Sequence, residues 1–443
     1  MTMPADPMDQ LRTRKYVMLL LLAGAIGVPV AVVAYFFLKL VNELQTYFFQ
    51  KLPGHLGFHG EPVWWPLPLL IVSGLLVGCA IKYLPGTGGH EPADGFKFGG
   101  GPATPIELPG IALAGLATLA LGVVLGPEAP LIAIGGGLGV LAVQLAKKDA
   151  APTSTIVIAT AGSFAAISTL FGSPLIGAFL LMEASGLGGP LLGLVLVPGL
   201  LSAGIGYLIF LGLNTWTGYG TFSLAIPHLP PFTTPDVAEF GWALVIGAGA
   251  AFLGLGVRQL ALFLRSRAKG GLLISTPLAG AIVALLAMAF EGLTGRGSST
   301  VLFSGQSALA PLVEHASSWT VGALVLLLVC KGLAYGTSLS SFRGGPVFPS
   351  LFLGAAGGLA LSHFAGLPLV PAVAMGIGAM STSMLKLPLT SVLLGSLFVV
   401  KDGYAAMPLV IVAVTVTYVL SAWITPVAPV AEGAAPAAAP ASS

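Results

Sequence analysis

The sequence predicts an all-α integral membrane protein, built as two inverted-topology repeats of tilted and broken helices. Three observations support this fold class: the composition, a series of short interrupted apolar runs, and a pair of motifs that recurs in both halves. Of the 443 residues, 56% are hydrophobic and only 8% are charged, and the mean hydropathy is +0.97. A typical soluble domain has about 25% charged residues. Most of the chain is therefore expected in a lipid bilayer, and the net charge of +2 indicates no nucleic-acid partner.

The amino terminus predicts the orientation of the chain. A short segment, residues 1–15, carries Arg12, Arg14 and Lys15 and precedes an apolar run at Tyr16–Leu40. That run is too long for the apolar core of a signal peptide, so it is expected to remain as a spanning helix. Basic residues beside a span favour the cytoplasmic side. We therefore expect a multi-pass protein of the cell membrane with a cytoplasmic N-terminus.

The next elements are an aromatic-rich stretch at Val41–Pro66, expected at the membrane interface, and a second span at Leu67–Leu84. After Pro109 the apolar runs are short, and Gly and Pro interrupt them. Several of these runs cannot cross a hydrocarbon core of ~30 Å as one straight helix. The expected runs lie at about 110–125, 130–146, 152–170, 174–184, 190–213, 240–264, 272–290, 319–335, 348–364, 370–385, 388–400 and 406–424.

These runs define the expected domain organisation. A cytoplasmic segment (1–15) precedes one transmembrane domain (16–425), and an Ala/Pro-rich tail (426–443) is expected to be disordered. Within the transmembrane domain we place the first repeat at about 16–213, a polar connector at 214–236 and the second repeat at about 237–425.

Two motifs recur in the two halves. The stretch Gly126–Pro130, GPEAP, is matched by Gly345–Pro349, GPVFP, at an offset of 345 − 126 = 219 residues. Ala166–Thr169, followed by Pro174, is echoed by AMST at 379–382, followed by Pro388, at 388 − 174 = 214 residues. Short, Gly- or Pro-interrupted segments at matching places in two halves indicate a binding site at the interface of the repeats.

Glu128 is the principal functional candidate, because it places one carboxylate inside the long apolar stretch 122–139. Gly126 and Pro127 interrupt a helix, and Pro is well tolerated in a first helical turn, so this motif predicts a break followed by a new helix. A helix start offers free N–H groups and a partial positive charge, which suit an anion. An ionisable residue at membrane depth is by default a functional-site hypothesis. The alternative is a structural turn with a solvated Glu.

These residues resemble the CLC family of chloride channels and transporters over about residues 16–425. Leu125–Pro130, followed by Ile134-Gly135-Gly136, is similar to the family signature in which the Glu is the gate. The loop Pro85–His90 resembles the family's Gly-Ser-Gly-Ile-Pro loop, with Thr87 at the Ser that contacts the central anion. Ser340–Leu351 resembles the segment with Gly-x-Phe-x-Pro. The resemblance implies a homodimer with one anion pathway in each subunit.

The resemblance also implies how the pathway works. Glu128 would occupy it as a carboxylate and leave it when protonated or swung aside. Backbone amides at the two helix starts, with the Thr87 hydroxyl, would replace the hydration of chloride or a similar monovalent anion. No cofactor, no metal and no enzymatic activity are implied. The anion-binding residues implied are Thr87, Gly126, Glu128, Ala129, Val347 and Phe348.

Three departures from the family pattern affect the expected site. Pro346 has no N–H, so one backbone donor that the family directs at the anion is missing. Arg343 stands three residues upstream and is a candidate for electrostatic support, although a snorkelling or cytoplasmic-face Arg is an equal alternative. The family's pathway Tyr lies beyond the last long helix, where this chain has only a Pro- and Ala-rich tail, and Tyr418 is a poor substitute by position.

The proton pathway departs from the pattern as well. Proton-coupled members carry a second Glu ten residues after the Pro of a helix start, and counting from Pro174 places Ala184 at that position. Ala cannot carry a proton. Glu183, the preceding residue, lies roughly 100° away around the helix. We expect it to be structural, with a substitute proton route as the alternative.

The sequence therefore favours glutamate-gated anion transport that is channel-like or only loosely coupled to protons. The first alternative is a strict anion/proton antiporter. The second is an organic-solute carrier, which would need a larger and more polar site at the membrane midplane. An intramembrane enzyme is disfavoured, because the chain has no HExxH motif and no Ser/His or paired-Asp constellation in its apolar runs.

Overall fold

The computed structural model describes residues 12–96, 101–146, 151–186, 190–218, 226, 229–268, 271–399 and 403–425. Throughout these ranges the regular elements are helical, and the only β-type pairing is one isolated bridge between Gly126 and Gly345. The expectation of an all-α protein is thus confirmed. The expected tail, most of the segment 1–15 and part of the connector 214–236 lie outside the described residues.

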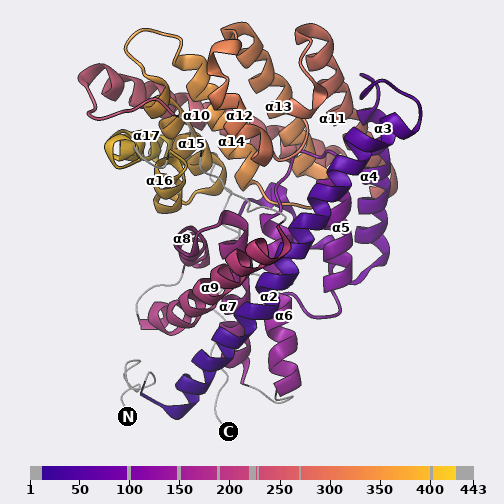
Figure 1. Ribbon diagram of the computed structural model, residues 1–443, viewed down its shortest axis with the longest axis vertical. Helices are drawn as coiled ribbons and strands as arrows, with labels where there is room; N and C mark the ends of the chain where they lie inside the picture. Colours follow the sequence, from indigo (N-terminus) through magenta and orange to yellow (C-terminus); the bar gives the residue numbers. More distant parts are fainter. Residues whose placement is uncertain are drawn as a thin grey trace, which may run out of the picture.

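The helices of the two halves occupy different parts of the molecule. In Figure 1 the second half, in orange and yellow, forms the upper part, and α2, α6, α7 and α9 of the first half lie below it. The bounds of the first-half helices are α2 Arg14–Thr46, α3 Leu52–His55, α4 Pro66–Tyr83, α5 Leu108–Ala120, α6 Glu128–Ala146, α7 Pro152–Phe171, α8 Pro174–Ser185 and α9 Pro190–Thr217. Those of the second half are α10 Val237–Arg267, α11 Leu272–Thr294, α12 Gln306–Glu314, α13 Val321–Ser341, α14 Val347–Leu361, α15 Leu369–Leu385, α16 Pro388–Leu397 and α17 Gly403–Ile424.

Within the described ranges, nine helices are long and apolar enough to cross a bilayer, as expected for a multi-pass membrane protein. The shorter apolar helices are α5, α8, α14, α15 and α16. The predicted end of the first span at Leu40 is too early. Helical structure continues through a π-helical turn at Tyr47–Lys51 to His55, because no Gly or Pro follows Leu40 before Pro53.

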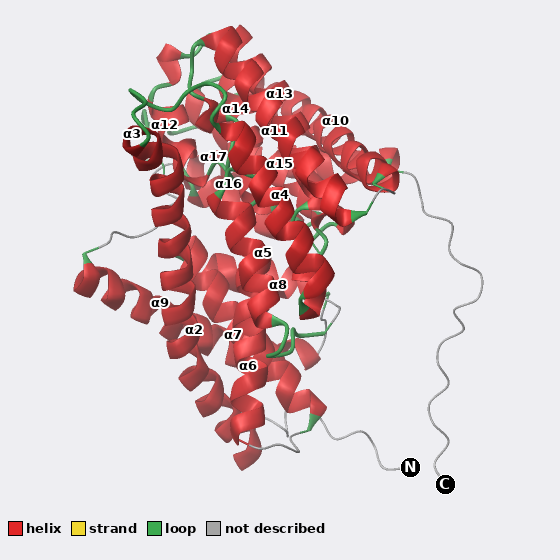
Figure 2. Ribbon diagram, turned by 90° about the vertical axis from the view of Figure 1, so that its right-hand side faces the viewer, coloured by secondary structure: helices red, strands yellow, loops and turns green. Residues whose placement is uncertain are grey.

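The two halves repeat one helix crossing. A Cβ added at Gly135 of α6 would lie 2.9 Å from the Gly162 carbonyl carbon of α7, and one at Gly354 of α14 would lie 2.6 Å from that of Gly376 on α15. The offsets, 354 − 135 = 219 and 376 − 162 = 214, equal those of the sequence motifs. Close approach of two backbones requires residues without side chains. Figure 2 shows α6 and α7 side by side in the lower part of the molecule.

A buried lysine stabilises the loop at residues 300–303, which contacts the segment before Glu128. Lys331 on α13 is completely buried, and its ammonium donates to the carbonyl oxygens of residues 300–303 at 2.9–3.3 Å. It also lies 4.4 Å from the ring centroid of Phe352 on α14. The last residue of this loop, Phe303, donates its N–H to Gly122 at 3.1 Å. Gly122 begins the segment that leads to Glu128. Lys331 therefore supports the backbone of this segment indirectly, through Phe303.

Candidate functional site

Glu128 is the first residue of α6, so the predicted break and helix start are confirmed. Its side chain is completely buried. The oxygen Oε1 accepts a hydrogen bond of 2.8 Å from the backbone N–H of Phe348, in the first turn of α14. Oε2 is buried and has no hydrogen-bond partner among the described residues. The carboxylate therefore lies between the starts of two helices, one from each half. The Phe348 N–H makes its one well-aligned hydrogen bond, and the N–H groups of Glu128 itself and Val347 also lie near it.

The two motif glycines join the halves directly beside this carboxylate. Gly126 donates to the carbonyl of Gly345 at 2.8 Å, and Gly345 donates back at 2.6 Å, in an antiparallel bridge. Equivalent segments that run antiparallel are what inverted repeats produce at their interface. A Cβ at either glycine would lie 2.6 Å from Cδ of Glu128, so only Gly leaves room for the carboxylate. The Gly126 N–H that we expected at the anion is engaged in this bridge.

The opposite wall of the site comes from α13 and α14. Val347 and Phe348 are both buried in the first turn of α14, and Pro346 is its N-cap. The hydroxyl of Tyr335, which is fully buried on α13, donates to the Pro346 carbonyl at 2.7 Å. Tyr335 is not among the site residues predicted from the sequence. Its position eleven residues before Pro346, in a helix leading to the motif, was the available signal.

Arg343 is buried and belongs to an ion-pair network that links both halves. Its Nε donates to the carbonyl of Thr87 at 3.1 Å, and one terminal nitrogen pairs with Glu91 at 3.2 Å. Arg265, near the end of α10, pairs with Glu91 at 3.2 Å and with Asp94 at 2.8 Å. A snorkelling Arg343 does not fit this burial. The network fixes the Thr87 loop against the segment that precedes α14.

Thr87 contributes a carbonyl to this network, and its φ of 48° lies in the left-handed region. No hydrogen bond of its hydroxyl is found within the described ranges. Ala129 is the second residue of α6, adjacent to Glu128. The structure thus brings Glu128, Ala129, Gly126, Val347 and Phe348 together around one carboxylate, whereas Thr87 joins them through Arg343.

Glu183 and Tyr418 lie in other parts of the molecule. The Glu183 carboxylate, near the end of α8, accepts from the backbone N–H groups of Leu389 and Thr390 at 2.9 and 2.8 Å, and from the Thr390 hydroxyl at 2.7 Å. It therefore stabilises the start of α16, where free N–H groups favour a negative charge. Tyr418 is on α17, and 43% of its surface is exposed.

The fold, with a carboxylate between two broken helices, is typical of one class: membrane transport proteins built from two repeats. The sequence profile described as voltage gated chloride channel matches residues 73–422. The chain therefore belongs to the voltage gated chloride channel (CLC) family. Members of this family are anion transporters or channels, not enzymes.

Similar proteins agree with this assignment. "Putative ion-transport protein YfeO" of Salmonella paratyphi A is 29% identical over 349 residues, which are 78% of this chain and 80% of that protein. A solved structure titled a slow cyanobacterial Cl−/H+ antiporter has a TM-score of 0.72 and 20% identity, and covers 91% of this chain and 94% of its own. A CLC-type fluoride/proton antiporter has a TM-score of 0.68 and 21% identity, with coverages of 91% and 95%.

Proposed function

We propose that this protein carries chloride or a similar monovalent anion across the cell membrane along a pathway that Glu128 gates. The observation that supports this most directly is the buried Glu128 carboxylate, which accepts the Phe348 N–H at 2.8 Å. An anion in place of the carboxylate would meet the same donor and the same helix starts. Backbone dipoles can bind an anion at close quarters without a full counter-charge, which would hold it too tightly for release.

The gate works by exchange between the carboxylate and the transported anion. Oε1 of Glu128 accepts the Phe348 N–H, and Oε2 has no hydrogen-bond partner in the described chain. An anion that replaces the carboxylate can accept from the same backbone N–H group, so the exchange leaves no donor unpaired. Protonation removes its charge and frees the Phe348 N–H, so the site becomes available to the anion.

Transport is channel-like or loosely coupled to protons in this proposal. Ala184, at the position expected for a second proton carrier, has no titratable group. The carboxylate of its neighbour Glu183 accepts hydrogen bonds from three donors at the start of α16. A group that caps a helix in this way is a poor relay, since protonation would break the contacts that hold it.

Strict anion/proton antiport is the second candidate. The similar solved structures include proteins titled Cl−/H+ and fluoride/proton antiporters. In that case Glu183 is the available carboxylate on α8 for a proton route. Coupling would then require the contacts of Glu183 with Leu389 and Thr390 to open in every cycle.

The functional unit in this proposal is a homodimer in the lipid bilayer, with the N-terminus in the cytoplasm. Leu175 on α8 and Leu389 and Leu397 on α16 are 59%, 46% and 42% exposed, and they provide apolar surface on two helices from different halves. Cross-linking of the reconstituted protein tests this association, and a species of one chain at all protein-to-lipid ratios would contradict it.

Anion efflux from proteoliposomes, with pH recorded at the same time, tests the proposed function. We expect efflux of chloride with little accompanying proton movement, because no proton carrier stands at Ala184. Proton uptake at a fixed ratio to chloride, able to run uphill, would establish antiport instead. Absence of anion efflux together with uptake of an organic solute would replace the proposal with a solute carrier.

A further inference from the structure

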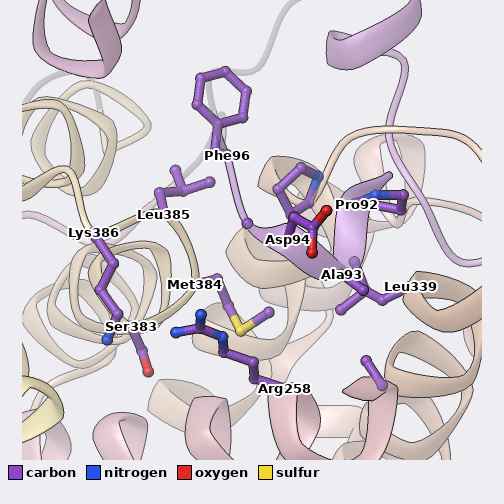
Figure 3. A pocket seen from close by; sticks show the side chains of 13 residues that line it. Pro92, Ala93, Asp94, Phe96, Arg258, Leu339, Ser383, Met384, Leu385 and Lys386 are labelled. Atoms are coloured by element: carbon purple, nitrogen blue, oxygen red, sulfur yellow. The ribbon is translucent and has the colours of Figure 1, made fainter. Parts of the chain in front are cut away.

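A cavity of about 250 Å³ lies beside the candidate anion site (Figure 3). Pro346, the N-cap of α14, lines it, two residues before the Phe348 N–H that binds Glu128. Asp94 lines another wall and pairs with Arg265 at 2.8 Å. The cavity therefore lies between the carboxylate site and the end of α10. The basic residues Arg265 and Arg267 in the last turn of α10 favour the cytoplasmic side.

Two cationic side chains line this cavity without a counter-charge from the described chain. Neither Arg258 nor Lys386 makes an ion pair or a side-chain hydrogen bond within the described ranges, and Nε of Arg258 is buried. In Figure 3 the charged ends of the two side chains point toward one another. Asp94 does not neutralise them, because it already pairs with Arg265. Both residues are only partly buried, but the Nε of Arg258 is buried without a hydrogen-bond partner, which is costly.

The backbone at Lys386 adopts a conformation that costs free energy for any residue other than glycine. Lys386 ends α15 in the left-handed conformation, with φ of 62°, a position that favours glycine. The equivalent position in the first half, at 386 − 172 = 214 residues, is Gly172 at the end of α7, with φ of 60°. The same turn is thus made by Gly in one repeat and by Lys in the other. A residue that accepts backbone strain of this kind suggests function.

The chemistry of the cavity fits an oxyanion better than a halide. A single halide carries one negative charge and would balance only one of the two positive charges. A divalent oxyanion balances both charges and offers several acceptor oxygens to the planar guanidinium, to the ammonium and to the nearby Ser383 hydroxyl. At roughly 30 Å³ for a water, the cavity also has room for such an anion with part of its hydration.

We propose that this cavity binds a divalent oxyanion of the phosphate class through Arg258 and Lys386, and that the bound oxyanion closes the anion pathway beside Pro346. The claim that the oxyanion closes the pathway rests on the proposed transport function, whereas the claim that it binds in the cavity does not. One experiment therefore tests binding and a second tests closure.

Thermal melting of the purified full-length protein with inorganic phosphate tests binding, against gluconate at the same ionic strength. We expect phosphate to raise the melting temperature to a saturating value. The double variant Arg258→Gln/Lys386→Gly should raise the half-saturating concentration at least tenfold, because each lost contact is charge-assisted. Lys386→Gly keeps the turn, as Gly172 shows, so this variant tests charge with the fold retained.

Lys82→Gln, at an exposed lysine of α4, is the control. No phosphate effect beyond gluconate, or an equal effect in the double variant, would overturn the site.

Chloride efflux from proteoliposomes with phosphate on both faces tests closure. We expect phosphate to reduce native efflux severalfold and to leave efflux by the double variant unchanged. Glycerol phosphate in a parallel arm distinguishes a soluble phosphate monoester from free phosphate as the ligand. Phosphate that binds in the melting assay without reducing efflux would overturn the closure alone. Proteoliposomes without efflux under any condition would contradict the proposed transport function, and the melting result would still decide the site.

Discussion

At the scale of single residues, Arg343 is buried three residues before Pro346, which has no N–H to donate. The guanidinium holds the Thr87 loop through a backbone carbonyl and pairs with Glu91. A positive charge at this point is thus a structural link, and in the proposed function it is also a source of positive potential for the anion site. These two roles make different demands, since only the first needs the planar shape of Arg.

Replacing Arg343 separates these roles. We expect Arg343→Gln to lower chloride affinity and flux severalfold, because the charge that offsets the missing Pro346 donor is removed. Arg343→Lys should retain most of the affinity and lose thermal stability, because the bonds to Thr87 and Glu91 depend on the guanidinium. Isotope flux against chloride concentration, combined with melting curves, provides the measurement. Equal affinity in all three proteins would assign Arg343 to structure alone.

A second residue-scale feature is the Glu61 carboxyl, which lies in the loop before α4. Burial raises the pKa of Glu61 to about 7, opposed by the hydrogen bond from the Ser298 hydroxyl and assisted by the charge of Glu291. A carboxyl whose pKa is raised in the folded protein binds its proton more tightly there than in the unfolded chain. Its ionisation therefore lowers stability as the pH rises from about 4.5 to about 7.

We expect Glu61→Gln to remove this pH dependence. The variant should melt a few degrees higher than the native protein at pH 8 and at the same temperature at pH 5, because Gln keeps an acceptor for Ser298 and carries no charge. Glu314→Gln, at an exposed residue, is the control and should not change the difference between the two pH values. A native melting temperature that does not fall between pH 5 and pH 8 would argue against the shifted carboxyl.

At the scale of elements, the repeated helix crossing holds both halves of the site in place. The pairs α6–α7 and α14–α15 approach closely at Gly135 and Gly354, about two turns after the helix starts on either side of the Glu128 carboxylate. A displacement of α14 would move the Phe348 N–H away from Glu128. Packing between these helices is therefore directly connected with the geometry of the gate.

Two glycines of α14 offer a matched pair of substitutions. A Cβ at Gly354 would lie 2.6 Å from the Gly376 carbonyl carbon, whereas one at Gly357 meets nothing within 4 Å. We expect Gly354→Ala to destabilise the protein by roughly 1–3 kcal/mol, as overpacking does. Gly357→Ala should be neutral or stabilising by up to about 1 kcal/mol, as Ala favours a helix. Melting curves of the two variants decide this, and equal melting temperatures would contradict the tight crossing.

Several of these elements could be predicted from local sequence. Gly and Pro fix where helices break, so the new helix at Glu128 and the repeat offsets followed from the residues themselves. The end of the first helix did not, because the aromatic residues after Leu40 suit both an interface and a helix. The antiparallel bridge between Gly126 and Gly345 and the pairing of Arg343 with Glu91 join residues more than 200 positions apart. Such contacts depend on how the two halves pack against each other, and a local sequence pattern cannot predict that packing.

At the scale of the whole molecule, the candidate site depends on the interface between the two repeats. The first half supplies the carboxylate of Glu128, and the second supplies the Phe348 N–H that binds it. The Gly126–Gly345 bridge fixes the distance between them. Both halves are therefore needed to form this carboxylate contact.

In the proposed function the Glu128 carboxylate competes with the transported anion. Chloride flux at acid and neutral pH, for the native protein and Glu128→Gln at matched reconstitution, tests this claim most directly. Gln keeps the shape and removes the charge, so the variant should conduct at both pH values with much less pH dependence. Native flux should rise as the pH falls, because protonation removes the competitor. If the native pH dependence survives intact in Glu128→Gln, Glu128 is not the gate.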